Sequence, residues 1–263
     1  MDIFTIISVE SEHYIYMKNL VLSLVAVVVM GSGQIASAGD ITGKVTLKGT
    51  PPPEKAIDFG DQCSGLPKPA DAASTTRHYV VGKDSGLANC FIYISKGLPP
   101  DKKYPVPSTP VEINQQGCMY YPYVSGVMVG QTLKFKNSDP LMHNVHALPA
   151  VDGNQEFNFA QPNQGDVNDT KWVASITKPE VMVKMKCEVH AWMFCYVGVQ
   201  DNPFFAVSDK DGNFKISGVP AGTYTLNCYH LKATAGTPGI TQQVTVADAP
   251  VKADFTVEVP APK

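Results

Sequence analysis

After residue 40, the apolar residues of this chain fall mostly into short runs bounded by glycine, proline or polar turn residues. These runs are rich in Val, Ile, Phe and Tyr, the residues that favour strands. None of them continues with the three-to-four-residue apolar period that a long helix requires. Gly and Pro number 21 each, which is typical of strands joined by turns. The sequence therefore predicts an all-β fold.

The expected strands form three groups along the chain. The first group lies at 41–47 and 90–95, on either side of a loop-like stretch at 54–86. A Pro-rich connector at 99–110 precedes the second group, which we place at 111–114, 124–129, 132–136, 144–148, 172–176, 181–186 and 196–199. The third group is at 204–207, 214–216, 220–226, 242–246 and 253–257.

The charge balance excludes a general nucleic-acid binder. The chain has 21 Lys and Arg against 24 Asp and Glu, a net charge of −3. Binding to nucleic acid or to an anionic membrane surface needs a basic surface, which this composition does not supply.

The first 38 residues have the pattern of an export signal. Lys18 precedes an apolar run at 20–30, and small residues at 36–38 provide a cleavage site. The apolar run is shorter than the roughly 20 residues that span a bilayer. We therefore expect a cleaved signal peptide at 17–38, with 1–16 as a misassigned start, and a periplasmic or secreted protein with no stable membrane insertion. An uncleaved membrane anchor is the alternative.

Export would place the cysteines in an oxidising compartment, where those that hold no metal are expected to pair. The six are Cys63, Cys90, Cys118, Cys187, Cys195 and Cys228. If one of them binds a metal, five remain and at least one stays without a disulfide. We expect Cys63 to pair with Cys118, although spacing alone does not determine connectivity.

One loop carries a set of metal donors. Cys187, His190 and Met193 are spaced at i, i+3 and i+6 between two expected strands. A thiolate, an imidazole and a thioether together favour copper over Mg, Ca or Mn. Two His and one Cys with a weak axial Met form the ligand set of blue copper sites. One short loop cannot surround an ion, so the second His must come from elsewhere, and the segment at 137–146, which contains His143 and His146, supplies it.

The segment at 137–146 (Asn-Ser-Asp-Pro-Leu-Met-His-Asn-Val-His) and the loop at 187–193 (Cys-Glu-Val-His-Ala-Trp-Met) resemble those of the cupredoxin family, most closely its amicyanin-like members. The resemblance covers about 111–200 and implies a Greek-key β-sandwich domain at 108–200. It also implies one type 1 copper ion held by His143, Cys187, His190 and Met193. By the same resemblance, Asn144 ties the two ligand loops together.

This chain departs from the family pattern at three positions, of which one is Cys195, shortly after the ligand loop. Ala191 stands where the family loop usually has Pro, and Met142 is an additional residue between Pro140 and His143. These departures bear on the rigidity of the loops, and so on the reduction potential, more than on metal binding.

Other kinds of metal centre fit less well. A dinuclear copper centre needs two closely spaced Cys on one loop, but Cys187 and Cys195 are eight residues apart. Met is a poor ligand for zinc. The His-x-His pair of a catalytic copper is absent from the sequence. We expect His78, His146 and His230 to be structural.

The expected function is one-electron transfer between exported redox proteins, and the chain is not expected to be an enzyme. The resemblance implies that His190 lies near the surface and passes the electron. An apolar docking patch would flank it, formed by Leu141, Met142, Ala191 and Trp192. The alternatives are a copper delivery or storage protein, and an extracellular scaffold in which copper is incidental. The sequence indicates no oligomeric state.

The segment at 209–226, with its Pro-Ala-Gly-Thr-Tyr strand, resembles carboxypeptidase regulatory-like domains, which are transthyretin-like β-sandwiches. The runs at 43–49 and 91–94 look like the opening strands of that fold. We therefore expect the copper domain to be inserted in, or packed beside, a second small sandwich whose halves are 40–100 and 201–258. Insertion requires contacts between 41–47 and 242–257.

Overall fold

The computed structural model describes residues 38–69, 72, 74–234 and 236–261. The predicted signal peptide lies outside the described residues except for Ala38, which begins the first strand. Within the described part of the chain, no helix is both long enough and apolar enough to cross a membrane.

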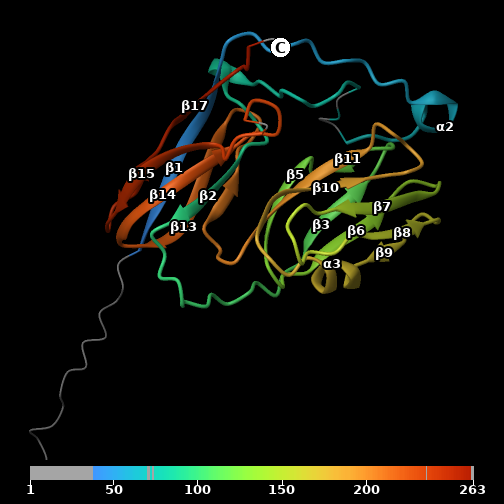
Figure 1. Cartoon of the computed structure of the whole chain (residues 1–263). Coiled ribbons are helices and arrows are strands. Elements are labelled where there is room, and N and C mark those ends of the chain that lie inside the picture. Colours follow the sequence, from blue (N-terminus) through green and yellow to red (C-terminus); the bar gives the residue numbers. More distant parts are fainter. Residues whose placement is uncertain (1–37, 70–71, 73, 235, 262–263) are drawn as a thin grey trace, which may run out of the picture. The chain divides into compact units, whose positions relative to one another are not determined.

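The fold is nearly all β, as the sequence predicts. In the described residues the helical elements are two short α-helices, α2 (Gly60–Ser64) and α3 (Thr170–Ser175), and a 3₁₀ turn, η1 (Lys83–Ser85). The strands form four sheets, which group into two sandwiches with separate cores (Figure 1).

The first sandwich contains strands from both ends of the described chain. One sheet has the order β13 (Asn213–Pro220), β1 (Ala38–Lys48) and β16 (Val251–Lys252), and β17 (Phe255–Glu258) also pairs with β1. The other has the order β12 (Phe205–Val207), β2 (Phe91–Lys96), β14 (Gly222–Tyr229) and β15 (Ile240–Val246). Ile41, Ile92 and Leu226 belong to the core that the two sheets enclose.

The pairing of β1 bears on the insertion hypothesis. Val45 lies beside Phe255 in parallel register with β17, and Ile41 lies beside Val251 in β16. Antiparallel pairing with β13 places Gly43 opposite Phe214. Strands that precede and follow the middle third of the chain thus share one sheet.

The second sandwich contains the strands between residues 111 and 200. Its five-stranded sheet has the order β5 (Val124–Met128), β11 (Phe194–Gln200), β10 (Glu180–Lys186), β7 (His143–Leu148) and β8 (Phe157–Gln161). The facing sheet has the order β4 (Tyr120–Tyr121), β3 (Val111–Gln115), β6 (Leu133–Asn137) and β9 (Val167–Asn168). Along β6 the burial alternates, with Leu133 and Phe135 in the core and Lys134 and Lys136 only partly covered.

The strand predicted at 172–176 is wrong, because α3 and its last turn occupy these residues. Trp172 and Ile176 are 1% and 0% exposed, whereas Val173 is 36% exposed. The N–H of Ile176 donates to the carbonyl of Trp172 at 2.9 Å. A helical turn brings residues four apart to the same face, so both large side chains reach the core. A strand would also place Trp172 and Ile176 on one face, but it would bury Ala174 between them and turn Ser175 outward, whereas Ala174 is exposed and Ser175 is buried.

Residues 59–66 pack against the second core although they precede β2 in the chain. Cys63 is 1% exposed and belongs to this core, and Phe59 and Leu66 lie against it. Cys63 forms a disulfide with Cys118, which confirms the expected pair. The segment around α2 is thus covalently attached to the second sandwich.

A pair of glycines lets the two sandwiches approach closely. Gly126 of β5 and Gly198 of β11 are register partners on adjacent strands. A Cβ atom on Gly198 would lie 2.4 Å from the Phe91 ring, and one on Gly126 would lie 3.0 Å from it. Phe91, at the start of β2, is 0% exposed. Its ring therefore lies flat on a surface that only glycine provides.

We predict that Gly198→Ala destabilises the metal-free protein by about 1–3 kcal/mol, the usual cost of overpacking a well-packed site. The measurement is the urea midpoint followed by circular dichroism. Gly65→Ala is the matched control, since no atom lies within 4 Å of a Cβ at Gly65 and its φ is −88°. Equal midpoints for the two variants would contradict the close contact with Phe91.

Candidate metal centre

The antiparallel pairing of β7 and β10 brings the two predicted ligand segments together. Lys186, the last residue of β10, lies opposite His146 of β7. His143 begins β7, and Cys187 follows β10 directly. The loop from Cys187 to Met193 then leads into β11. The start of β7 therefore lies beside the end of β10, and the predicted donors lie together at this end of the two strands.

Three of the four predicted ligands converge. The Nδ1 atoms of His143 and His190 are 3.1 Å apart, and the Cys187 Sγ lies 3.8 Å from the Nδ1 of His190. One donor atom from each of the three residues lies within 4.8 Å of the other two. Their exposed fractions are 0% for His143, 2% for Cys187 and 5% for His190. Two imidazole nitrogens and one sulfur thus share a small buried space.

Met193 closes the loop and is fully buried. Its N–H donates to the carbonyl of His190 at 2.9 Å, and its own carbonyl accepts from the N–H of Cys187 at 3.0 Å. Its side chain is 0% exposed and lies in the same core as Cys187. The predicted axial ligand is therefore on the loop that carries the thiol and one imidazole.

Asn144 ties the two ligand segments together, as the resemblance implied. Its side-chain oxygen accepts from the N–H of Glu188 at 2.6 Å, and its side-chain nitrogen donates to Asn158 at 2.8 Å. The backbone N–H of Asn144 also donates to the Cys187 sulfur. The residue after one ligand thus holds the loop that carries the other two.

The thiol of Cys187 is poised to ionise. Burial alone would raise its pKa, but hydrogen bonds from His143 and His190 and from the backbone N–H groups of Asn144 and His190 lower the pKa to about 6. A thiolate is the form that binds a metal. Burial would lower the pKa of His143, but hydrogen bonds to Asp139 and Cys187 raise it. The donors fit a soft, positively charged ion such as copper.

Asp139 is a residue of this centre that the sequence did not indicate. Its carboxylate lies 2.9 Å from the Nε2 of His143, and it is 1% exposed. It stands in the Asn-Ser-Asp-Pro segment, where Asp is common because its side chain makes turns. Only the fold shows that this carboxylate faces a candidate ligand.

His190 is 5% exposed, so other side chains cover its ring and close it off from solvent. Its Nε2 is 4.0 Å from the Sγ of Cys118 in the disulfide. Its ring lies 5.3 Å from that of Trp192, whose indole N–H donates to the carbonyl of Cys118 at 3.0 Å. Phe59 packs edge-on against Trp192 at 5.8 Å. The disulfide and these two aromatic rings separate His190 from solvent.

The residues expected to form a docking patch differ in exposure. Met142 is 47% exposed and Ala191 is also exposed, whereas Leu141 and Trp192 are half-buried. Met142, just before β7, and Ala191, in the loop from Cys187 to Met193, thus present apolar side chains to solvent beside the buried donors.

The other histidines in the part of the chain that the structure describes do not join the centre. His146 bonds to Glu156 and Glu188. His230 is 2% exposed and accepts N–H bonds from Lys232 and Ala233. His78 stacks on Phe194.

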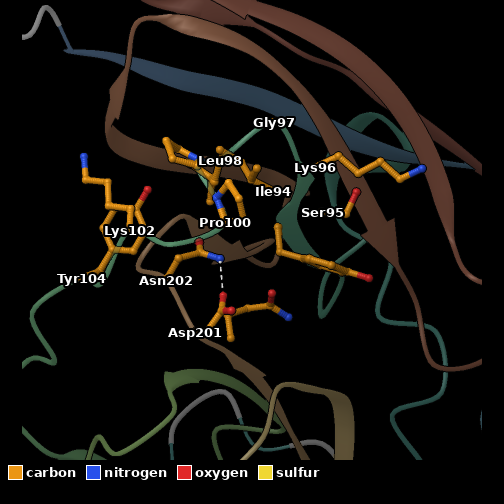
Figure 2. Close-up of a pocket in the computed structure, with 13 residues that line it drawn as sticks. Ile94, Ser95, Lys96, Gly97, Leu98, Pro100, Lys102, Tyr104, Asp201 and Asn202 are labelled. Carbon is orange, nitrogen blue, oxygen red and sulfur yellow. Dashed lines mark hydrogen bonds between the residues drawn. The ribbon is translucent and has the colours of Figure 1, made fainter.

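A surface pocket of about 220 Å³ lies away from this centre (Figure 2). Its lining comes from the end of β2, the Pro-rich connector and the segment after β11, and includes Tyr93, Lys96, Tyr104, Asp201 and Asn202. None of the four predicted ligands lines it, so it does not serve as an entrance to the donors.

Comparison with known proteins gives structural neighbours only. No protein-family model matches the chain, and no curated protein matches it significantly. Its structural neighbours include a purple cupredoxin from Nitrosopumilus maritimus (25% identity, 34% of this chain and 99% of that one, TM-score 0.28). A Cu(I) structure of an amicyanin variant is another (18% identity, 41% and 98%, TM-score 0.29). A copper-containing nitrite reductase from Thermus scotoductus also matches (23% identity, TM-score 0.30), with 40% of this chain covering 25% of that one.

We predict a distinctive pH dependence for the metal-free protein. Because the folded pKa of Cys187 is about 6 and an unfolded thiol has a pKa of about 8.5, the unfolded state binds more protons between these values. The contribution of Cys187 to stability is therefore complete above about pH 8.5 and is lost as pH falls through about 6.

The measurement is the urea midpoint of the wild type and Cys187→Ser across this range. The urea midpoint of the wild type should increase relative to that of Cys187→Ser as pH rises. His143 titrates in both proteins, and part of the rise in its pKa comes from Cys187 itself, so the difference reports the thiol together with its interaction with His143. A difference independent of pH would show that the thiol is not ionised in the folded protein.

Proposed function

We propose that this chain is an exported type 1 copper protein that carries single electrons between redox partner proteins. His143, Cys187, His190 and Met193 would hold the ion. The proposal rests on three buried donor atoms that lie close together. They are the sulfur of Cys187, whose thiol has a lowered pKa, and the Nδ1 atoms of His143 and His190. This donor set, with Met193 on the same loop, matches the ligand set of blue copper.

When bound, copper would supply a one-electron couple. The protein contributes a donor set that is already held in place. Asn144 fixes the loop to β7, and the Met193 hydrogen bonds close the loop on itself. Hydrogen bonds of this kind orient metal ligands and tune the metal. If all four residues bound the ion, they would leave no open position for substrate, which favours a carrier over an enzyme.

Burial of the donors favours electron transfer over copper delivery. A delivery protein must release its ion readily, which requires an accessible site. Here His190 lies beneath Trp192 and the Cys63–Cys118 disulfide, and His143 and Cys187 are more deeply buried still. Electrons can cross a thin layer of packed side chains, whereas an ion cannot leave without opening it.

We further propose that a carboxypeptidase regulatory-like sandwich, formed by 40–100 and 201–258, supports the inserted copper domain at 108–200. The sharing of one sheet by β1, β13, β16 and β17 supports this arrangement. The Cys63–Cys118 disulfide supports a periplasmic or secreted location, because disulfides persist in oxidising compartments. Transient redox partners would meet the exposed side chains of Met142 and Ala191.

Copper-loaded Cys187→Ala should lose the intense visible absorption that a Cu(II)–thiolate bond produces, while its circular dichroism remains that of a folded protein. Cys195→Ala is the matched control, because Cys195 is equally buried and eight residues away, and burial raises the pKa of its thiol. The control should keep the absorption. Strong absorption in the Cys187 variant would reject the ligand assignment.

Voltammetry and chelator challenge separate a carrier from a delivery protein. The wild type should show a reversible one-electron wave and should retain copper against an excess of a competing chelator over hours. Phe59→Ala, which thins the cover over Trp192, should lose copper faster. Complete loss from the wild type within the mixing time would favour delivery instead.

A further inference from the structure

The carboxylate of Asp139 accepts three hydrogen bonds at the edge of the candidate metal centre. One comes from His143 Nε2 at 2.9 Å, and the other two come from the backbone N–H groups of Gly117 and Cys118 at 2.7 and 2.8 Å. The N–H of Asp139 itself donates to the side-chain oxygen of Asn137 at 2.9 Å. Every one of these contacts is buried. The orientation of the carboxylate is therefore fixed from several sides.

These bonds keep Asp139 ionised. Its two oxygens face the N–H groups of His143, Gly117 and Cys118, all within 2.9 Å. A carboxylate that accepts several N–H bonds is stable as an anion even in a poorly solvated place. Asp139 therefore places a negative charge beside Nε2 of His143, on the opposite side of that ring from the nitrogen that faces His190.

The contact also selects one tautomer of His143. An ionised carboxylate has no proton to give, so the Nε2 of His143 must be the protonated nitrogen. Nδ1 is then the nitrogen that can give up its proton and offer a lone pair to a metal, and this atom faces His190 Nδ1 at 3.1 Å. The ring is thus held with its metal-binding nitrogen toward the other donors.

We propose that Asp139 is the positioning residue of the centre and that its buried charge lowers the reduction potential of the bound copper. This inference rests on the proposed function. A fixed negative charge stabilises the ion with the higher positive charge, so Cu(II) gains more than Cu(I). Partners of this kind that orient a ligand histidine typically change metal affinity 10- to 100-fold.

The inference also gives the disulfide a role in the centre. Cys118 donates its backbone N–H to Asp139, and its sulfur is joined to Cys63. The turn that holds the carboxylate is therefore the turn that the disulfide attaches to α2. One short segment thus supports His143 through Asp139 and covers His190 through its sulfur.

The test is Asp139→Asn in the full-length copper protein. Asn removes the charge and keeps only one acceptor oxygen, so it can retain either the bond from Gly117 or the bonds from Cys118 and His143. We expect the ratio of Cu(I) to Cu(II) affinity to rise at least about tenfold, which for a one-electron couple corresponds to a potential about 59 mV higher. Asp139→Glu, which keeps the charge, should remain closer to the wild type.

Glu180→Gln is the matched control. Glu180 is a carboxylate of the same sandwich, 6% exposed, and it accepts backbone N–H bonds from Ala150 and Val151. It touches none of the four predicted ligands in the part of the chain that the structure describes. Its variant should lose stability in the same way as Asp139→Asn without moving the potential.

The outcomes separate the two proposals. If the wild type shows no Cu(II)–thiolate absorption, the proposed function fails. If that absorption is present but Asp139→Asn has the potential of Glu180→Gln, the role of Asp139 is overturned and the copper assignment stands.

A measurement on the wild type decides the matter if Asp139→Asn does not fold. In the Cu(I) protein, nuclear magnetic resonance should detect a slowly exchanging proton on the Nε2 of His143. A proton-free Nε2 would overturn the inference without any variant.

Discussion

The stabilisation of a sulfur anion inside a β-sandwich is the constraint on which this structure depends. Cys187 is 2% exposed, and burial by itself disfavours its ionised form. Two imidazoles and two backbone N–H groups reverse that preference. They can do so only because β7 and β10 are antiparallel neighbours, which places His143 and Asn144 opposite the loop that follows β10. The order of strands in this sheet is therefore also the basis of its chemistry.

The sequence predicted the parts of the centre that are encoded locally. Cys187, His190 and Met193 lie within one loop, and alternating apolar residues identified the strands on either side. Asp139 was beyond such reasoning, because an Asp in a turn most often serves the turn. The sequence also could not predict which side chains cover His190. Phe59 is far from the loop in sequence, and its contact with Trp192 depends on the path of the whole chain.

The same distinction applies to the fold. Most strands were predictable because period-two burial is a local pattern, as along β6. Trp172 and Ile176 were misassigned because a short apolar segment fits either a strand or a helical turn. The strand β8 was missed within a polar stretch because it lies at the edge of its sheet and alternates buried Phe157 with exposed Asn158. In each case neighbouring elements decided between local alternatives that the sequence left nearly equal.

The path of α2 has a consequence for how such a protein can evolve. The segment from 111 to 200 includes every predicted copper ligand, so it resembles a module that recombination could move to another gene. Moved alone, however, it would lose Cys63 and Phe59, leaving Cys118 as a lone thiol beside an imidazole and Trp192 without its partner. The heritable unit must therefore begin upstream of Phe59, well before the first strand of this segment.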